Sequence, residues 1–368
     1  MRSIRVIEYE NLGKLNKAFF DEYKKSFSDV LESGWYILGK QVAQFEQEFA
    51  SFCGAKYCVG VANGLDALTI ALKAFDFPKG SEVLVPSNTY IATILAIVNA
   101  NLKPVLVEPD ISTYTIDSKK MEAAITPQTK AVMPVHLYGR MADMKTILET
   151  ARKHGLKIIE DAAQAHNASI DGKKAGGWGD FTCFSFYPTK NLGALGDAGA
   201  LTTDNEELYN KVKALRNYGS AVKYHNDYIG VNSRMSEVQA AFLRIKLRKL
   251  EEITQHKEKL AQIYYSMLKD TDFILPAKTD GFRHVYHIFN IRTKRRDELK
   301  NFLLENEIKT EIHYPVAPNR QPAMKGILDS FETPIAQEIH DTTLSLPISY
   351  FHTEDDILHV CDVLKRFR

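Results

Sequence analysis

The sequence of 368 residues has almost no net charge and no long apolar stretch. Lys and Arg number 47 and Asp and Glu number 46, which gives a formal charge of +1 with neutral histidines. A chain without excess positive charge has no electrostatic affinity for nucleic acid or for an anionic membrane. The longest apolar stretch in the first half, residues 91–98, is far shorter than the roughly 20 residues of a spanning helix. We therefore expect neither a nucleic-acid partner nor a membrane partner.

The sequence also lacks the marks of a secreted or metal-binding protein. Residues 1–14 mix acidic and basic side chains and contain no apolar segment of the kind that a secretory signal requires. The only close cysteine pair, Cys53 and Cys58, has no second pair or nearby histidine to complete a zinc site. We expect these two, with Cys183 and Cys361, to be small buried residues outside any disulfide. These features predict a cytoplasmic protein without a metal site.

Short apolar runs alternate with helical patterns between residue 57 and about residue 216. Continuous runs of Val, Ile and Leu are typical of strands buried on both faces, and helices between them are typical of parallel connections. The sequence therefore predicts an α/β fold with a mostly parallel seven-stranded sheet. The expected strands cover residues 57–62, 82–86, 104–107, 131–135, 156–159, 181–186 and 200–203.

The pattern changes after the predicted sheet. At a prior of roughly 150 residues per domain, a chain of 368 residues suggests two or three domains. Residues 235–261 carry the pattern of a long helix or a pair of helices, and shorter strand and helix patterns follow. We predict a large α/β domain in residues 1–250 and a smaller α+β domain in residues 251–368, with about residues 1–30 packing on the small domain. Residues 246–249 are expected on a charged, solvated helix face.

Polar side chains follow several predicted strands, where ligands bind in open α/β sheets. Asp161 follows the fifth strand and Lys190 follows the sixth, so we expect both side chains to face one cleft. Partial burial lowers the pKa of a lysine and leaves a neutral amine that can form a Schiff base. An aspartate opposite such a lysine would keep a pyridine nitrogen protonated, which makes the ring an electron sink. This pair matches the chemistry of pyridoxal 5'-phosphate.

Other residues at the same strand ends match the remainder of that cofactor. The Ser185 hydroxyl and the backbone amides of Gly64 and Leu65, at a helix N-terminus, can hold a phosphate. Tyr90 can lie flat on an aromatic ring. Each of these residues could also have a purely structural role, for example Asp161 as a helix cap. Their joint order along the chain favours cofactor binding. The Walker motif is absent, and the glycine-rich segment does not fit the dinucleotide fingerprint.

Three histidines have more than one reading. His136 stands at a strand end, where it could line the cleft or serve only the structure. His284 and His287 are expected near the junction of the two domains, where they would pack or bind substrate. A metal role is disfavoured because no carboxylate or cysteine in their neighbourhood completes a ligand set.

Two segments carry a resemblance to a known family. Residues 160–166 (EDAAQAH) and 184–193 (FSFYPTKNLG) resemble the DegT/DnrJ/StrS nucleotide-sugar aminotransferases, which have the type I, aspartate aminotransferase-like fold. The similarity extends from residue 33 to residue 315. The resemblance implies that Lys190 forms the Schiff base with pyridoxal phosphate and that Asp161 meets the pyridine nitrogen.

The same resemblance implies roles for further residues around the cofactor. Gln164 would bond the ring hydroxyl, Ser185 the phosphate, and Tyr90 would stack on the ring. Asn232, in residues 230–234 (GVNSR), resembles the family asparagine that reaches the phosphate in the neighbouring subunit. An active site completed in this way requires a homodimer with shared active sites.

Residues 63–68 (NGLDAL), 87–92 (SNTYIA) and 191–197 (NLGALGD) resemble a subgroup of this family. Its members aminate C3 of a dTDP-linked 3-keto-6-deoxyhexose. The products are 3-amino-3,6-dideoxyhexoses of surface polysaccharides, such as lipopolysaccharide O-antigens, and of some antibiotics. Glutamate is the expected amino donor.

By this similarity the nucleotide sugar would contact Tyr187, Lys223, His313 and Tyr314. The sequence departs from the subgroup at Asn319, where many relatives have histidine, and at Ala198 in place of a commoner glycine.

The sequence does not decide the configuration of the sugar at C4. It also leaves two alternative functions open. One is a C4 aminotransferase acting on a UDP- or dTDP-4-keto sugar, and the other is a non-catalytic nucleotide-sugar-binding protein. A binder needs no Schiff-base lysine, so the intact site residues argue against it.

Overall fold

The computed structural model describes residues 6–222 and 224–367, and a large sheet lies at its centre. Within these residues the sheet has seven strands in the order β1-β9-β8-β5-β4-β2-β3. β9 is antiparallel to both of its neighbours, and the other pairs are parallel. The predicted mostly parallel seven-stranded sheet is confirmed. Its strands are β1 (Tyr57–Val61), β2 (Glu82–Pro86), β3 (Lys103–Val107), β4 (Thr129–Val132), β5 (Lys157–Asp161), β8 (Phe181–Ser185) and β9 (Gly199–Thr203).

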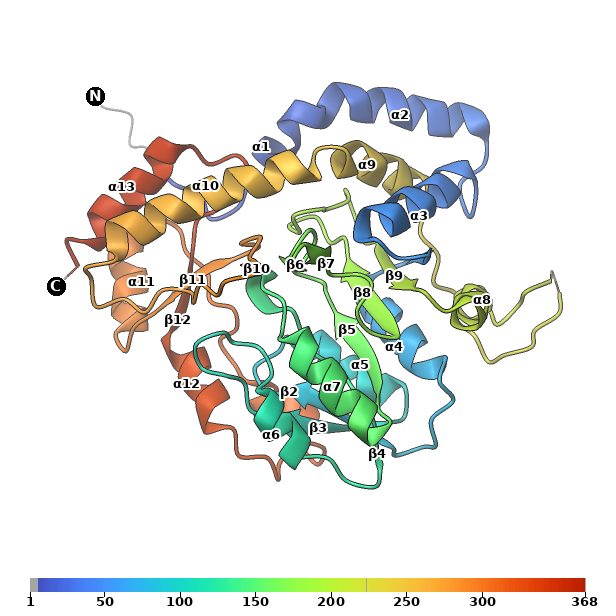
Figure 1. The fold of residues 1–368 in the computed structure, drawn as a ribbon. Coiled ribbons are helices and arrows are strands. Elements are labelled where there is room, and N and C mark those ends of the chain that lie inside the picture. The colour runs from blue at the N-terminus through green and yellow to red at the C-terminus, as the bar shows by residue number, and fades with distance from the viewer. Residues whose placement is uncertain (1–5, 223, 368) are drawn as a thin grey trace.

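Helices cover both faces of this sheet (Figure 1). Side chains alternate between the faces along a strand, so Leu84 of β2 joins one hydrophobic cluster while Val83 and Val85 join the other. Burial on both faces explains the continuous apolar runs in the sequence. The helices of the first cluster are α3 (Lys40–Cys53), α6 (Ser118–Ala123), α7 (Met144–His154) and α9 (Glu237–Leu247). Those of the second are α4 (Gly64–Lys73), α5 (Ile91–Asn99) and α8 (Glu206–Leu215).

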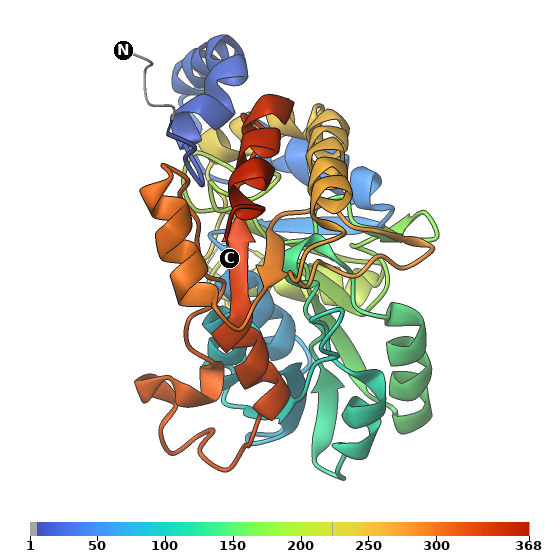
Figure 2. The same cartoon turned by 90° about the vertical axis from the view of Figure 1, so that its left-hand side faces the viewer.

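The C-terminal part of the chain builds a smaller α+β layer around a two-stranded sheet. β11 pairs antiparallel with β12, and the ring of Tyr264 stacks on that of Phe289 with 4.6 Å between centroids. Figure 2 shows these elements, coloured gold to red, in front of the α/β part. They are α10 (Leu250–Leu268), β11 (Phe289–Arg292), α11 (Arg296–Glu305), α12 (Pro334–Thr342), β12 (Thr343–Leu346) and α13 (Glu354–Leu364).

The N-terminal segment touches both parts of the molecule. Ile7 joins the hydrophobic cluster of the C-terminal part and forms a bridge with Ile308. Further along, Tyr23 packs on Phe242 of α9, with 4.8 Å between ring centroids. Residues 1–5 of the predicted N-terminal packing segment lie outside the described part. The N-terminal helices are α1 (Leu12–Asn16), η1 (Lys17–Phe19) and α2 (Phe20–Ser33).

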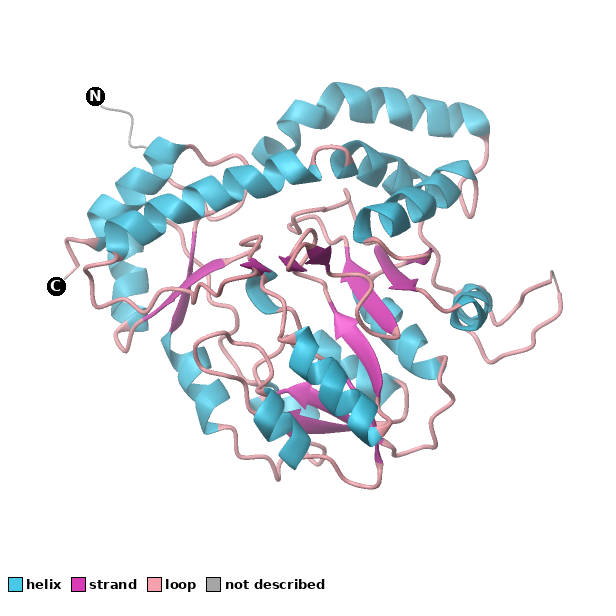
Figure 3. Cartoon of the chain, in the orientation of Figure 1, coloured by secondary structure: helices cyan, strands magenta, loops and turns pink. Residues whose placement is uncertain are grey.

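Short elements join the two parts of the chain. β10 of the C-terminal part pairs antiparallel with β6, which follows the fifth strand of the large sheet. Figure 3 shows these short strands between the large sheet and the C-terminal sheet. The short strands are β6 (Ser169–Ile170), β7 (Lys173–Lys174) and β10 (Phe282–Arg283). The remaining 3-10 helices are η2 (Leu137–Gly139), η3 (Pro318–Arg320) and η4 (Pro322–Met324).

The structure corrects one expectation about the helical segment of residues 235–261. The segment is a pair of helices, α9 and α10, but Lys246 does not lie on a solvated face, since its exposed fraction is 0%. The reason is that Lys246 lies on the inner side of α9, where its side chain donates to the Gly193 carbonyl at 3.3 Å, whereas Arg248 and Lys249 are exposed as expected. The four cysteines are buried and free, as expected. Among the described residues, no helix is long and apolar enough to cross a bilayer.

Candidate active site

A cavity of about 680 Å³ opens at the carboxyl ends of the central strands. Asp161 is the last residue of β5 and Ser185 the last of β8, and these strands are parallel neighbours. Parallel strands place the residues at their carboxyl ends along one edge of the sheet, where ligands bind. The cavity brings together ten of the site residues predicted from the sequence: Gly64, Leu65, Tyr90, Asp161, Gln164, Ser185, Tyr187, Lys190, His313 and Tyr314.

Lys190 is partly buried in this cavity, just after β8. Its backbone N–H donates to the Tyr187 carbonyl at 2.8 Å, which turns the chain back toward the sheet. Burial lowers the pKa of its amine to about 8, although the charge of Asp161 acts in the opposite direction. Within the part of the chain that the structure describes, the Nζ atom has no hydrogen-bond or ion-pair partner. The amine is therefore available to react near neutral pH.

Asp161 is buried and held in a fixed orientation. The Thr93 hydroxyl donates to its Oδ2 at 2.8 Å, and the Ala163 N–H donates to its Oδ1 at 3.1 Å. Burial raises the pKa of the carboxyl, while these two donors favour its ionised form. Such a carboxyl can share a proton with a basic nitrogen placed in the cavity.

The N-terminus of α4 forms another wall of the cavity. The Asn63 side chain caps this helix by accepting from the Asp66 N–H at 2.8 Å, and the next residues, Gly64 and Leu65, line the cavity. A Cβ atom on Gly64 would lie 2.6 Å from Cβ of Ser185, so only glycine allows the helix to approach that serine. Unpaired N–H groups of a helix end beside a hydroxyl suit an anion such as a phosphate.

An aromatic wall stands on the side of the C-terminal part. The Gln164 amide donates to the Tyr314 hydroxyl at 2.7 Å, and its oxygen accepts from the Tyr138 N–H at 2.6 Å. The ring of Tyr314 lies 5.0 Å from that of Tyr90, which is 52% exposed. A flat ligand can therefore enter beside Tyr90, while Gln164 stays fixed.

His313 and Tyr187 complete the rim. His313 places Nδ1 2.9 Å from the Ser345 hydroxyl, and its carbonyl accepts from the Tyr138 hydroxyl. Burial lowers the pKa of His313 to about 4, so its imidazole is neutral at physiological pH. The Tyr187 side chain is 51% exposed at the cavity mouth.

One predicted site residue is not in this cavity. Asn232 is exposed and lies outside it. The neighbouring Ser233 is buried beside the start of α4, where its hydroxyl donates to Asp66 at 2.6 Å and accepts from the Ala62 N–H at 3.0 Å. Lys223 lies outside the described residues.

The histidines divide into structural and cavity-lining groups. His136 is structural, because its Nε2 lies 2.8 Å from Glu160 and its Nδ1 accepts from the Ala142 N–H. His284 packs on Tyr286 with 4.1 Å between ring centroids. His287 lines the cavity, and burial holds its pKa well below the ordinary value. Among the described residues, no set of three or more potential ligands could hold a metal ion.

Sequence reasoning missed Thr93, although a signal was present. Thr93 lies on the first turn of α5, and it is the hydroxyl in a run of otherwise apolar residues. It is buried, and its contact with Asp161 joins residues that are 68 positions apart. A buried hydroxyl in an apolar helix needs a polar partner, but the sequence does not say which one.

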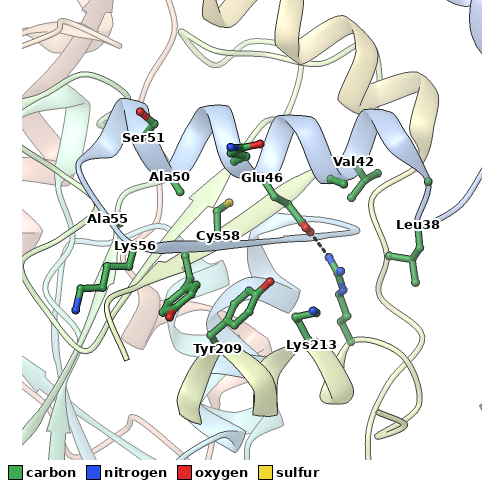
Figure 4. A pocket seen from close by; sticks show the side chains of 15 residues that line it. Leu38, Val42, Glu46, Ala50, Ser51, Ala55, Lys56, Cys58, Tyr209 and Lys213 are labelled. Atoms are coloured by element: carbon green, nitrogen blue, oxygen red, sulfur yellow. Dashed lines mark hydrogen bonds and ion pairs between the residues drawn. The ribbon is translucent and has the colours of Figure 1, made fainter. Parts of the chain in front are cut away.

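A second cavity of about 680 Å³ lies beside the edge strand β1, between α3 and α8 (Figure 4). Glu46 and Arg216 form an ion pair there. Glu46 accepts from the Gly60 N–H at 2.8 Å, and Arg216 donates to the Gly60 carbonyl at 2.6 Å. Edge strands leave backbone groups without strand partners. The ion pair satisfies such groups on β1, so its role is structural.

The main cavity fits pyridoxal phosphate by its own chemistry. Lys190 offers a partly buried amine, Asp161 a buried carboxyl on the neighbouring strand, and Gly64 with Ser185 a close approach where a phosphate could bind. Together with the mainly parallel sheet, this set defines an enzyme of the type I pyridoxal-phosphate class.

The chain belongs to the DegT/DnrJ/EryC1/StrS aminotransferase family, whose family model matches residues 19–365. It is 49% identical over 363 residues to the dTDP-3-amino-3,6-dideoxy-alpha-D-galactopyranose transaminase of Aneurinibacillus thermoaerophilus, covering 98% of this chain and 99% of the relative. The protein is an aminotransferase, and pyridoxal phosphate is its cofactor.

Solved structures show the same fold. DesV of S. venezuelae, solved in complex with a ketimine intermediate, is 41% identical with a TM-score of 0.96, over 98% of both chains. NtdA of Bacillus subtilis, solved with bound cofactor PMP, is 30% identical with a TM-score of 0.92. That match covers 99% of this chain and 86% of NtdA.

Proposed function

We propose that this aminotransferase converts a dTDP-linked 3-keto-6-deoxyhexose to the dTDP-3-amino-3,6-dideoxyhexose, with glutamate as amino donor. The observation that carries the proposal is the placement of Lys190 and Asp161 at neighbouring strand ends of one cavity, in a chain 49% identical to a dTDP-3-amino-sugar transaminase. The product would serve a surface polysaccharide or an antibiotic. We further propose that the enzyme works in the cytoplasm.

Each group around the cavity has a proposed part in holding the cofactor. The N–H groups of Gly64 and Leu65 and the Ser185 hydroxyl would bind its phosphate. Tyr90 would stack on its ring, and Gln164 would bond the ring hydroxyl. The fixed Gln164 amide, already bonded to Tyr138 and Tyr314, supports this orientation.

When bound, pyridoxal phosphate supplies an aldehyde that condenses with amines, with loss of water, and a pyridine ring that accepts electrons. Lys190 would hold this aldehyde, and its neutral Nζ would serve as the base that accepts and returns a proton during amino transfer. A positioned base of this kind contributes about 10²–10⁴-fold. Asp161, oriented by Thr93 and Ala163, holds a proton at the ring nitrogen.

The nucleotide sugar would bind at the mouth of the cavity, against Tyr187, His313 and Tyr314. These side chains present two aromatic rings and a neutral imidazole toward the same opening, which suits an uncharged sugar ring. Lys223 is proposed as a further contact of the nucleotide sugar.

We propose that two copies of the chain share their active sites. Residues 218–222 and 224–230 extend from the body beyond α8 (Figure 1) and carry strongly exposed side chains, including Val222 at 63% and Ile229 at 95%. In a dimer, the partner chain would cover these apolar side chains and remove them from water. The loop ends near Asn232, which lies outside the cavity of its own chain. Asn232 would then reach the cofactor phosphate in the partner's site.

The reaction is tested by incubating the purified enzyme with glutamate and each 3-keto and 4-keto nucleotide sugar. The product is identified by mass and by NMR. We expect amination at C3 of the dTDP-linked 3-keto sugar. Amination at C4 would establish the alternative enzyme. Absence of turnover with all of these substrates, in protein that binds the cofactor, would support a nucleotide-sugar-binding role.

Site sharing is tested by mixing two inactive variants, Lys190→Ala and Asn232→Asp. The new aspartate would repel the cofactor phosphate, so this variant should bind pyridoxal phosphate weakly. A mixed dimer has one site with both native residues, so activity should return after subunit exchange. A mixture that stays inactive despite demonstrated exchange would place Asn232 in its own chain's site, or in none.

A further inference from the structure

Two lysines are buried directly behind the active-site segment that follows Lys190. Lys246, from α9, is 0% exposed, and Lys257, from α10, is 5% exposed. Neither forms an ion pair with a carboxylate anywhere in residues 6–222 and 224–367. The charge of Glu10 reaches both lysines and favours their protonation, but only from a distance.

The polar partners of these lysines lie in the segment that follows Lys190 and at His287, which lines the cavity. The Lys257 ammonium donates to the Asn191 side-chain oxygen at 2.8 Å and to the His287 carbonyl at 3.3 Å. Lys246 donates to the Gly193 carbonyl at 3.3 Å. Asn191 follows Lys190 directly, and His287 lines the same cavity. The two buried amino groups therefore hold the backbone and side chains next to the reactive amine.

The segment of residues 187–193 is built so that such contacts fix Lys190. A Cβ atom on Gly193 would lie 2.3 Å from the Pro188 carbonyl oxygen, so the chain folds closely back on itself. The Asn191 amide also donates to the Val285 carbonyl at 3.0 Å. A shift of Asn191 would move its covalent neighbour Lys190 with it.

Burial of these ammonium groups is costly for the fold. A charge inside a protein without an opposite charge is destabilising, and an apolar side chain of similar volume would be tolerated better. Burial accordingly lowers the pKa of Lys246 to about 8 and that of Lys257 to about 7. Departures of this kind from the usual burial pattern are expected at functional sites.

We propose that Lys257, assisted by Lys246, is a positioning residue for the reaction. Through Asn191 and the His287 carbonyl it holds Lys190 in reach of its reaction partner. This inference rests on the proposed role of Lys190 as the amine that binds pyridoxal phosphate. Lys246 acts at the far end of the same segment and over a longer hydrogen bond, so its contribution is smaller.

The decisive variant is Lys257→Met, which keeps the volume and removes the donors. The main measurement is the rate at which cofactor-free protein captures added pyridoxal phosphate, with the adduct reduced by borohydride and located by peptide mass spectrometry. We expect capture and kcat to fall about 10- to 100-fold, since small misplacements of reacting groups have effects of that size. KM for the sugar should change by less than about twofold, because the substrate contacts are untouched.

A second readout separates positioning from a structural role. The urea midpoint of cofactor-free Lys257→Met should equal or exceed that of the native protein, because a buried unpaired charge is removed. Lys257→Arg keeps the donors and should recover most of the capture rate. The control is Lys259→Met, the same change at an exposed position on the same helix, where Lys259 pairs with Glu354. It should leave all measurements unchanged.

Asn191→Ala provides an independent test if Lys257→Met does not fold. It removes the acceptor of the Lys257 hydrogen bond and should slow capture to a similar degree. If Lys257 acts through Asn191, the double variant is no slower than the slower single variant. Capture at the native rate in Lys257→Met or in Asn191→Ala, or full additivity of the two losses, overturns the inference. An adduct on a lysine other than Lys190 in the native protein would instead refute the proposed function.

Discussion

The reactivity of Lys190 offers a direct test of its burial, because a neutral amine reacts and an ammonium does not. Burial lowers the pKa of this lysine to about 8, whereas an ordinary lysine titrates near about 10.4. At pH 7, about one-tenth of the Lys190 amine is then neutral, compared with roughly one part in 2,500 for the ordinary lysine. Lys190 is therefore expected to hold roughly 200-fold more neutral amine at pH 7.

The sign of the pH dependence follows from the direction of the shift. Lowering the pKa means that Lys190 loses its proton at a lower pH. Below about pH 8 its reactivity should rise tenfold per unit of pH, and above about pH 8 it should level off. An ordinary lysine continues to gain reactivity up to about pH 10.

The assay is competitive acetylation of the cofactor-free protein between pH 6 and about pH 11, followed by peptide mass spectrometry. The exposed Lys79 serves as the internal reference. Each lysine is normalised to its own plateau, so that limited access of the reagent to the cavity does not affect the midpoint. A Lys190 profile that follows Lys79 up to pH 10 would refute the argument from burial.

Four further substitutions are expected to have distinct effects. Asp161→Asn should leave the fold intact and slow single turnover by orders of magnitude, because the ring loses its electron sink; a near-native rate would contradict the role of Asp161. Thr93→Val should lower kcat about tenfold through the lost hydrogen bond to that carboxyl, with unchanged cofactor stoichiometry as the check. Gly64→Ala should weaken cofactor binding in an absorbance titration, since its Cβ would lie 2.6 Å from Cβ of Ser185; unchanged affinity would exclude the cradle. Glu237→Gln should lower the free energy of unfolding in urea by about 2 kcal/mol, because the buried carboxylate accepts from three N–H groups at the start of α3.

Much of the fold could be predicted because the relevant information is local in the chain. Strands buried on both faces require continuous apolar runs, and seven such runs matched seven strands. The candidate site followed from the same logic, since Asp161 and Ser185 end neighbouring parallel strands. Because the carboxyl ends of parallel strands lie along one edge of the sheet, the sequence alone predicted that these two residues lie in one cavity.

The surroundings of Lys190 could not be predicted in this way. The pattern of residues 246–249 indicated a solvated face, yet Lys246 is fully buried because it lies on the inner side of α9, against the Gly193 carbonyl. The residues next to Lys257 in the sequence do not indicate its hydrogen bond to Asn191, which is 66 positions away. His136 had two readings from sequence, and its contact with Glu160 decides for the structural one.

The sequence by itself determined the fold class, the strand ends that carry Lys190 and Asp161, and, through its motifs, the cofactor and the family. These depend on short-range patterns of side chains and on the regular geometry of parallel strands. Only the tertiary structure decided which hydroxyl orients Asp161, and that the amines of Lys246 and Lys257 lie behind the reactive segment. The physical reason is that a polar group acquires its hydrogen-bond partner and its pKa from whatever packs against it, and those neighbours come from distant parts of the chain.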